Sequence, residues 1–159
     1  MPISLQKFAV IFGLLVLVWN PLHADHQLRE AKTCLYWELL GNGHFFSLNI
    51  ERLLGSHVAV RAGWGVTGGL IMGSVLAGRG EHLLELGCGP SFGKNNFNRF
   101  DLLTLNFVFG YRYQKPLGGL LLRAGFTPVI FLDDIQNNAF TVQRNRLTPK
   151  VGVSIGYAF

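Results

Sequence analysis

The stretch of sequence that decides the fold is DLLTLNFVFGYRYQ, residues 101–114. Its apolar and polar residues alternate with a period of two, which is the pattern of a β-strand whose two faces meet different environments. One face carries large apolar side chains and ends in two tyrosines, whereas the other face is polar or small. The apolar face is Leu103, Leu105, Phe107, Phe109, Tyr111 and Tyr113, and the other is Thr104, Asn106, Gly110, Arg112 and Gln114.

The same alternation recurs between glycine- and proline-containing turns from residue 33 onward, and we find no helical period there. Clear cases are FFSLNIER (45–52), VAVRAGWGVT (58–67), LLLRAGFT (120–127) and KVGVSIGYAF (150–159). The pattern predicts about eight strands, of which the first and fourth are the least regular. We expect Pro90 and Pro128 at strand ends or bulges, because proline cannot donate a ladder hydrogen bond. The expected strands lie near 34–41, 44–53, 57–67, 70–78, 81–92, 100–114, 118–131 and 147–159.

The segment HLLELGCGPSFGK, residues 82–94, contains two partial nucleotide-binding motifs. Residues 84–89 resemble the first motif of S-adenosylmethionine-dependent methyltransferases, and residues 93–94 resemble the end of a phosphate-binding loop. That loop requires glycine at position 88 and serine or threonine at 95, where this chain has Cys88 and Asn95. The segment also alternates like its neighbours, and another strand follows it. We therefore interpret it as a strand and not as a nucleotide site.

The amino end is predicted to be a secretory signal covering residues 1–24. Lys7 supplies the positive charge, residues 8–19 form an apolar run, and Ala24 precedes the expected cleavage site. Twelve apolar residues are too few for a membrane-spanning helix, which needs about 20. The mature chain is then one domain, residues 25–159.

The composition suits an exported membrane barrel. The chain is 49% hydrophobic and 14% charged, whereas a soluble domain has about 25% charged residues, and no second apolar run is long enough to span a membrane as a helix. A closed β-barrel is the remaining way to cross a bilayer. Basic residues are scattered, so we predict no nucleic-acid partner. The strand phases point Cys34 and Cys88 in opposite directions, so we expect free thiols, and no motif indicates a metal or cofactor.

Alternation alone does not say which face points inward, because a soluble carrier barrel and a membrane barrel have opposite polarity. Two features favour the membrane barrel. The apolar face carries aromatic residues at strand ends, as interfacial girdles do, and the polar face is rich in glycine, which suits a narrow lumen. The aromatic residues are Tyr111, Tyr113, Tyr157 and Phe159 at one rim and Phe46 and Trp64 at the other. We predict an all-β fold: a single antiparallel up-and-down transmembrane β-barrel of about eight strands, present as a monomer.

The carboxyl end, VGVSIGYAF, places Tyr157 and Phe159 at alternate positions of the last strand. It resembles the terminal signal that the insertion machinery recognises in Gram-negative outer-membrane barrels. The segments YWELLGNG, FSLNIER and GYRYQKPLGGLLLRAGFTP also resemble a family of small, largely uncharacterised outer-membrane β-barrel proteins. The resemblance implies a location in the outer membrane of a Gram-negative bacterium, with membrane lipid and the insertion machinery as partners. It implies no catalytic residues.

Three functional classes remain open. The first is a non-enzymatic barrel that serves membrane structure or displays loops, such as the predicted loop 133–149. The second is a lipid A deacylase or acyltransferase, which would need a nucleophile beside a histidine and a carboxylate. The third is a narrow pore, which eight strands disfavour because side chains fill so small a barrel. Candidate pairs for the enzyme are His44 with Ser47, His57 with Ser56, and His82 with Glu81 or Glu85.

The strand phases also predict a charged network inside the barrel. Three acids and three arginines occupy inward positions and cancel in charge, with Asn49 and Asn106 as neutral partners. Buried charges are costly unless paired, and guanidinium groups suit carboxylates. We therefore expect a structural Glu/Arg plug formed by Glu38, Glu51, Glu85, Arg61, Arg112 and Arg123.

Overall fold

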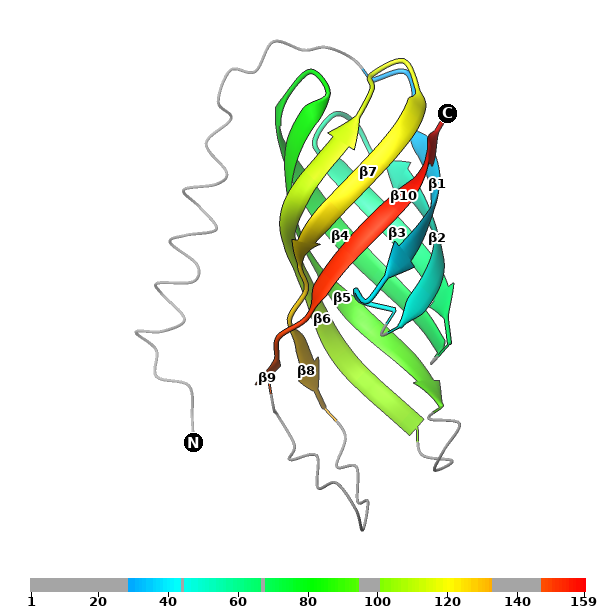
Figure 1. Ribbon diagram of the computed structural model, residues 1–159, viewed down its shortest axis with the longest axis vertical. Helices are drawn as coiled ribbons and strands as arrows, with labels where there is room; N and C mark the ends of the chain where they lie inside the picture. The colour runs from blue at the N-terminus through cyan, green and yellow to red at the C-terminus, as the bar shows by residue number, and fades with distance from the viewer. Residues whose placement is uncertain (1–28, 44, 67, 95–100, 133–146) are drawn as a thin grey trace, which may run out of the picture.

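The computed structural model describes residues 29–43, 45–66, 68–94, 101–132 and 147–159, and these residues form an antiparallel β-barrel (Figure 1). The strands follow one another around the barrel, and β5 pairs with β6 to close it. Within this part of the chain, no helix is long and apolar enough to cross a membrane. The strands are β1 Thr33–Leu39, β2 Phe46–Leu53, β3 Val58–Gly65, β4 Gly68–Arg79, β5 His82–Lys94, β6 Asp101–Gln114, β7 Gly119–Phe126, β8 Val129–Phe131, β9 Leu147–Thr148 and β10 Val151–Ala158.

The ten strand segments form eight continuous barrel strands, which we call staves. β8 continues β7, and β10 continues β9, each along the same line of pairing. The register of β6 is unchanged across the first break: Phe109 pairs with Phe126, and Asn106, three residues away, pairs with Val129. The break at Pro128 confirms the strand end or bulge expected there, within the expected strand 118–131. The expectation of an unbroken strand over 147–159 was wrong. Pro128 and Pro149 stand in the two breaks, where their missing N–H groups interrupt the ladder.

Two details of β4 and β5 also differ from expectation. Pro90 does not end a strand but lies inside β5, paired with Leu105 on the β6 side. The β4–β5 ladder has a gap beside it, between the pairs Leu70–Ser91 and Gly73–Cys88. β4 is longer than the expected 70–78 and alternates in burial despite its irregular sequence.

The stagger of the strands fixes the tilt of the barrel. From Tyr36, register partners on neighbouring strands can be followed in both directions until both paths reach the β7–β8 stave. One path ends at Phe131 and the other at Leu121, ten residues apart along the chain. In eight strands such a stagger corresponds to a tilt of about 40° from the barrel axis. The long path runs through Asn49, Gly63, Leu70, Ser91 and Thr104, and the short path runs through Gly156.

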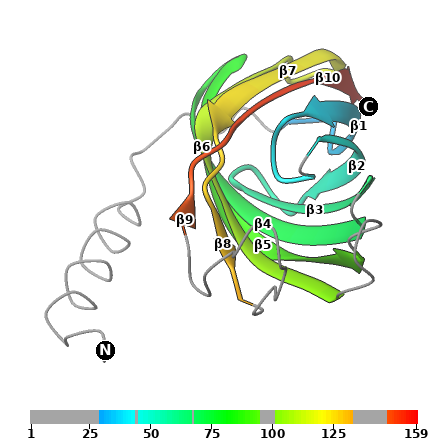
Figure 2. The same cartoon turned by 60° about the horizontal axis from the view of Figure 1, so that its bottom comes forward.

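The two ends of the barrel differ. We call one the terminus end, because β1 begins there, β10 ends there, and the turns β2–β3, β4–β5 and β6–β7 lie there (Figure 1). The other we call the loop end, where β1, β3 and β8 finish. Figure 2 shows the staves curving around a single interior from the loop end.

Candidate functional site: the charged lumen

The barrel has an apolar exterior and a polar interior. On β2, for example, Leu48 and Ile50 are exposed, whereas Asn49 and Glu51, which alternate with them, are buried. The other long staves also have their apolar face outside, as the aromatic strand ends and the glycine-rich polar face predicted. Apolar residues do fill parts of the lumen, notably Leu53, Leu70, Met72, Leu76 and Leu121.

All six charged residues predicted to point inward lie in the lumen, and none is more than 7% exposed. Four ion pairs join them: Arg61 with Glu38, Arg112 with Glu51 and with Glu85, and Arg123 with Glu85. Six different staves supply the six side chains, because inward positions at similar depth face one another across a narrow barrel.

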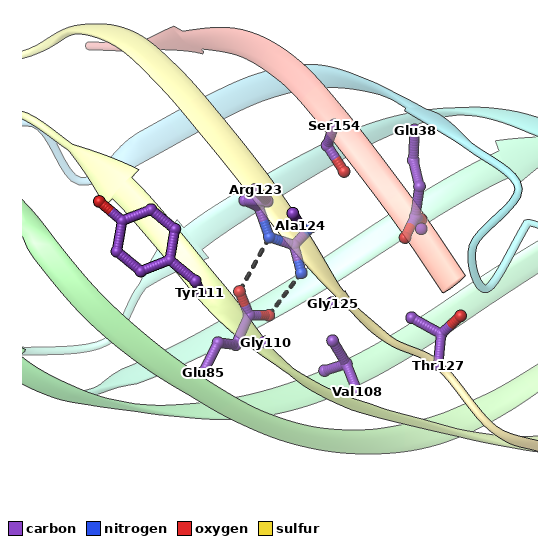
Figure 3. Close-up of a pocket in the computed structure, with 11 residues that line it drawn as sticks. Glu38, Glu85, Val108, Gly110, Tyr111, Arg123, Ala124, Gly125, Thr127 and Ser154 are labelled. Atoms are coloured by element: carbon purple, nitrogen blue, oxygen red, sulfur yellow. Dashed lines mark hydrogen bonds and ion pairs between the residues drawn. The ribbon is translucent and has the colours of Figure 1, made fainter. Parts of the chain in front are cut away.

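Glu85 is the junction of this group. Arg123 donates to both of its carboxylate oxygens, from Nε at 2.8 Å and from Nη2 at 2.5 Å (Figure 3). Ser74 on β4 donates to the same carboxylate at 3.0 Å, and Arg112 Nη1 lies 3.9 Å away. The bidentate geometry matches the planar guanidinium to the carboxylate, which is the strong form of this pairing.

Arg112 is fully buried and uses its whole guanidinium group. Nη1 donates to Glu51, Nε donates to Gln114 Oε1 at 2.9 Å, and Nη2 donates to the sulfur of Cys34 at 3.3 Å. Because every nitrogen has a partner, the removal of Arg112 would leave several polar groups unpaired at once.

Tyr36 joins the two halves of the network, and the sequence did not single it out. Its hydroxyl donates to Glu51 Oε2 at 3.3 Å and accepts from Arg61 Nη1 at 3.2 Å. The Arg123 guanidinium carbon lies 4.8 Å from the centre of its ring, which is within the range of a cation–π contact. The sequence signal for Tyr36 was weak, since this residue occupies an inward position of the first strand, one of the two least regular predicted strands.

A fourth arginine lies at the terminus end. Arg29 is 7% exposed, and it donates to the carbonyl oxygens of Gln114 at 3.1 Å and Gly80 at 2.5 Å. The backbone N–H groups of Glu30 and Ala31 both donate to Pro116 O. Residues 29–31 therefore lie across this end of the lumen. The expected neutral balance holds for the six network residues but not once Arg29 is included, and no alternation marks a residue that precedes the first strand.

The two asparagines are buried as expected, but in the described part of the chain neither hydrogen bonds to a charged side chain. Asn49 donates to Ser47 Oγ at 2.9 Å, and Asn106 donates to Thr104 Oγ1 at 3.1 Å. They lie nearer the loop end than the arginines, so the lumen has a charged middle and a neutral polar section beyond it. The expectation that they would partner the charges was wrong.

The histidine pairs do not form a triad in the described structure. His44 lies outside the described residues. Ser56 Oγ lies 2.7 Å from His57 Nδ1 at the β2–β3 turn, and no described carboxylate hydrogen bonds to that imidazole. His82 is exposed on the exterior and contacts Tyr111 and Tyr113. Glu85 points into the lumen from the same strand, so the proposed His82–Glu85 pair was wrong.

The two cysteines are free, as expected: Cys34 faces the lumen and Cys88 the exterior. Among the described residues, no cluster of three or more His, Cys, Asp or Glu side chains could hold a metal ion. No protein-family model, curated protein or solved structure matches this chain.

Proposed function

We propose that this protein is an integral outer-membrane β-barrel of a Gram-negative bacterium, with a lumen filled by side chains and a non-enzymatic role in membrane structure or loop display. The observation that carries the proposal is the polarity of the barrel, which is the inverse of that of a water-soluble barrel. Leucine, valine, isoleucine and aromatic side chains cover the exterior, while arginine and glutamate side chains are buried inside. A water-soluble barrel would expose this apolar surface to water at a large free-energy cost.

The dimensions of the apolar exterior support a bilayer as its environment. A stave of about ten residues, rising ~3.3 Å per residue and tilted by about 40°, spans about 25 Å along the barrel axis. This is the height of the lipid-facing band of outer-membrane barrels, about 25 Å. The register gives the tilt, so the estimate does not depend on the amino-acid composition.

Aromatic side chains occupy the two rims of this band. Tyr111, Tyr113 and Tyr157 lie on the exterior toward the terminus end, and Trp64 lies near the loop end at 70% exposure. Trp37 and Phe46 stack near the loop end with ring centres 4.7 Å apart. Amphipathic rings at the two interfaces are typical of membrane barrels. The signal at residues 1–24, and Tyr157 and Phe159 as the insertion signal, belong to the same proposal.

Tryptophan fluorescence tests the exterior directly. A mature chain beginning at Asp25 has two tryptophans, Trp37 and Trp64, and both lie on the exterior. In vesicles whose lipids carry brominated acyl chains, we expect strong quenching of their emission relative to unbrominated vesicles. The variants Trp37→Phe and Trp64→Phe assign the signal to each residue. Emission that responds to aqueous acrylamide but not to lipid bromination would count against a lipid-facing exterior.

The filled lumen predicts that the barrel does not conduct ions. The network occupies the middle of the barrel, and residues 29–31 lie across the terminus end. In planar bilayers we expect no stable conductance steps, while a wide porin inserted under the same conditions provides the positive control. Large, stable conductance would overturn the role of the network as a plug.

A further inference from the structure

The charged residues and Tyr36 form a nearly closed circuit, which we call the lumen ring. Neighbouring members are joined by the hydrogen bonds and ion pairs described above, and one gap remains. Glu38 and Arg123, the two ends of the circuit, make no direct ion pair in the described structure. In order, the ring is Glu38, Arg61, Tyr36, Glu51, Arg112, Glu85 and Arg123.

The gap exists because a small residue separates the two ends. Glu38 on β1 pairs in register with Ser154 on β10, and Ser154 pairs with Arg123 on β7. The three inward side chains therefore form a row across adjacent strands, with the short serine between two long charged groups (Figure 3). A cavity lies at this place, and its lining includes these three residues together with Glu85, Thr127 and Gly152.

Three polar atoms around the cavity have no hydrogen-bond partner in the protein. They are Glu38 Oε2, Arg123 Nη1 and Thr127 Oγ1, and their side chains are at most 7% exposed. Glu38 Oε2 lies 3.6 Å from Arg61 Nη1, but it accepts no hydrogen bond from the described residues. Buried polar atoms are almost always satisfied by protein or by ordered water. Three such atoms around one cavity therefore indicate a bound group.

The charges around the cavity indicate what kind of molecule it can bind. A cation would meet the Arg123 guanidinium, and an anion would meet the Glu38 carboxylate, so neither ion suits the site. A neutral molecule that both donates and accepts can satisfy the acceptor on Glu38 and the donor on Arg123 together. The cavity has room for about one water molecule.

We propose that this cavity is a binding site for one ordered water molecule, which closes the lumen ring. The water donates to Glu38 Oε2, accepts from Arg123 Nη1 and hydrogen bonds to Thr127 Oγ1. With it, hydrogen bonds and ion pairs connect side chains of seven staves, since Ser74 on β4 donates to Glu85 in the ring. The water is thus part of the plug.

A crystal structure of the mature protein at a resolution that shows waters tests the site. We expect one peak within hydrogen-bonding distance of Glu38 Oε2, Arg123 Nη1 and Thr127 Oγ1. An empty cavity, a bound ion, or a direct Glu38–Arg123 contact would overturn the proposal.

Thermal unfolding of two variants tests the energetic role of the water. Ser154→Val would fill an empty cavity with methyl groups, and valine favours strands, so a dry cavity predicts a higher unfolding midpoint. A bound water predicts the opposite, because valine displaces it and leaves three buried polar atoms unsatisfied. We expect the midpoint of Ser154→Val to fall by at least a few degrees below that of Ser154→Ala, which keeps the space. A midpoint for Ser154→Val at or above the wild-type value would refute the water site, whatever membrane the barrel occupies.

Discussion

Replacing Glu85 with leucine should cost about 3–5 kcal/mol of unfolding free energy, the usual penalty for removing one partner of a buried ion pair. Glu85 accepts two hydrogen bonds from Arg123 and one from Ser74, and it lies beside Arg112. The variant therefore leaves the Arg123 guanidinium buried without its carboxylate. Denaturant unfolding of the barrel in lipid vesicles or detergent measures the loss. Arg112→Leu should have an effect of similar size, because it leaves Glu51 and the Gln114 side chain without their Arg112 partner. It also removes one of the two arginines that pair with Glu85.

Leu105→Val is the control for these variants, since it shortens an apolar side chain outside the network and should change stability little. The double variant Glu85→Leu/Arg123→Leu separates pairing from burial. Because it removes both charges, it should lose less stability than the sum of the single variants. If Glu85→Leu and Leu105→Val unfolded at the same denaturant concentration, the network would have no structural role.

Gly156→Ala should also be strongly destabilising, by about 1–3 kcal/mol, the usual cost of overpacking a tight site. Gly156 pairs with Tyr36 in register, and a methyl group there would collide with Leu35 O and with Tyr36 Cβ, and would lie 2.5 Å from Tyr36 Cα. Tyr36 could not keep its position, and its hydroxyl joins Arg61 to Glu51. The effect should appear as a lower unfolding midpoint.

Gly73→Ala is the matched control, because the same substitution on β4 points to the exterior and meets no atom within 4 Å. Alanine there should be neutral or stabilise by up to about 1 kcal/mol, since it restricts the unfolded chain. Equal destabilisation by the two alanines would mean that strand propensity, and not the space beneath Tyr36, decides the result.

Much of the fold could be predicted because one face of every long strand carries exposed apolar side chains and the other faces the lumen. In residues 101–114 the alternation with a period of two follows directly from this difference between the faces, and no other structure fits the pattern. β4 was harder because Leu70, Met72 and Leu76 are apolar on the inward face as well. The break at Pro149 was missed because pairing resumes in the same register beyond it. Pro128 was expected at a strand end or bulge, and there too the register continues beyond the break.

Within the lumen, side-chain direction could be predicted but partners could not. Alternation places Glu85 and Arg123 inside, yet which arginine reaches which carboxylate depends on the stagger between strands, which is not visible in one sequence. Asn49 and Asn106 illustrate this, because they point inward but lie too near the loop end to meet the charges. Arg29 was missed because its burial depends on residues 29–31, before β1, lying across the end of the barrel, and no periodicity in the sequence indicates that.

The central claim is that the apolar exterior lies in the outer membrane, and cell fractionation followed by a gel-shift assay tests it most directly. The experiment expresses the full chain in a Gram-negative host, separates inner-membrane, outer-membrane and periplasmic fractions, and runs each with and without boiling. We predict that the protein is found in the outer-membrane fraction and migrates differently before and after heating, because an intact closed barrel resists detergent until it is boiled. Recovery in the soluble periplasmic fraction, with no shift on heating, would contradict the membrane barrel.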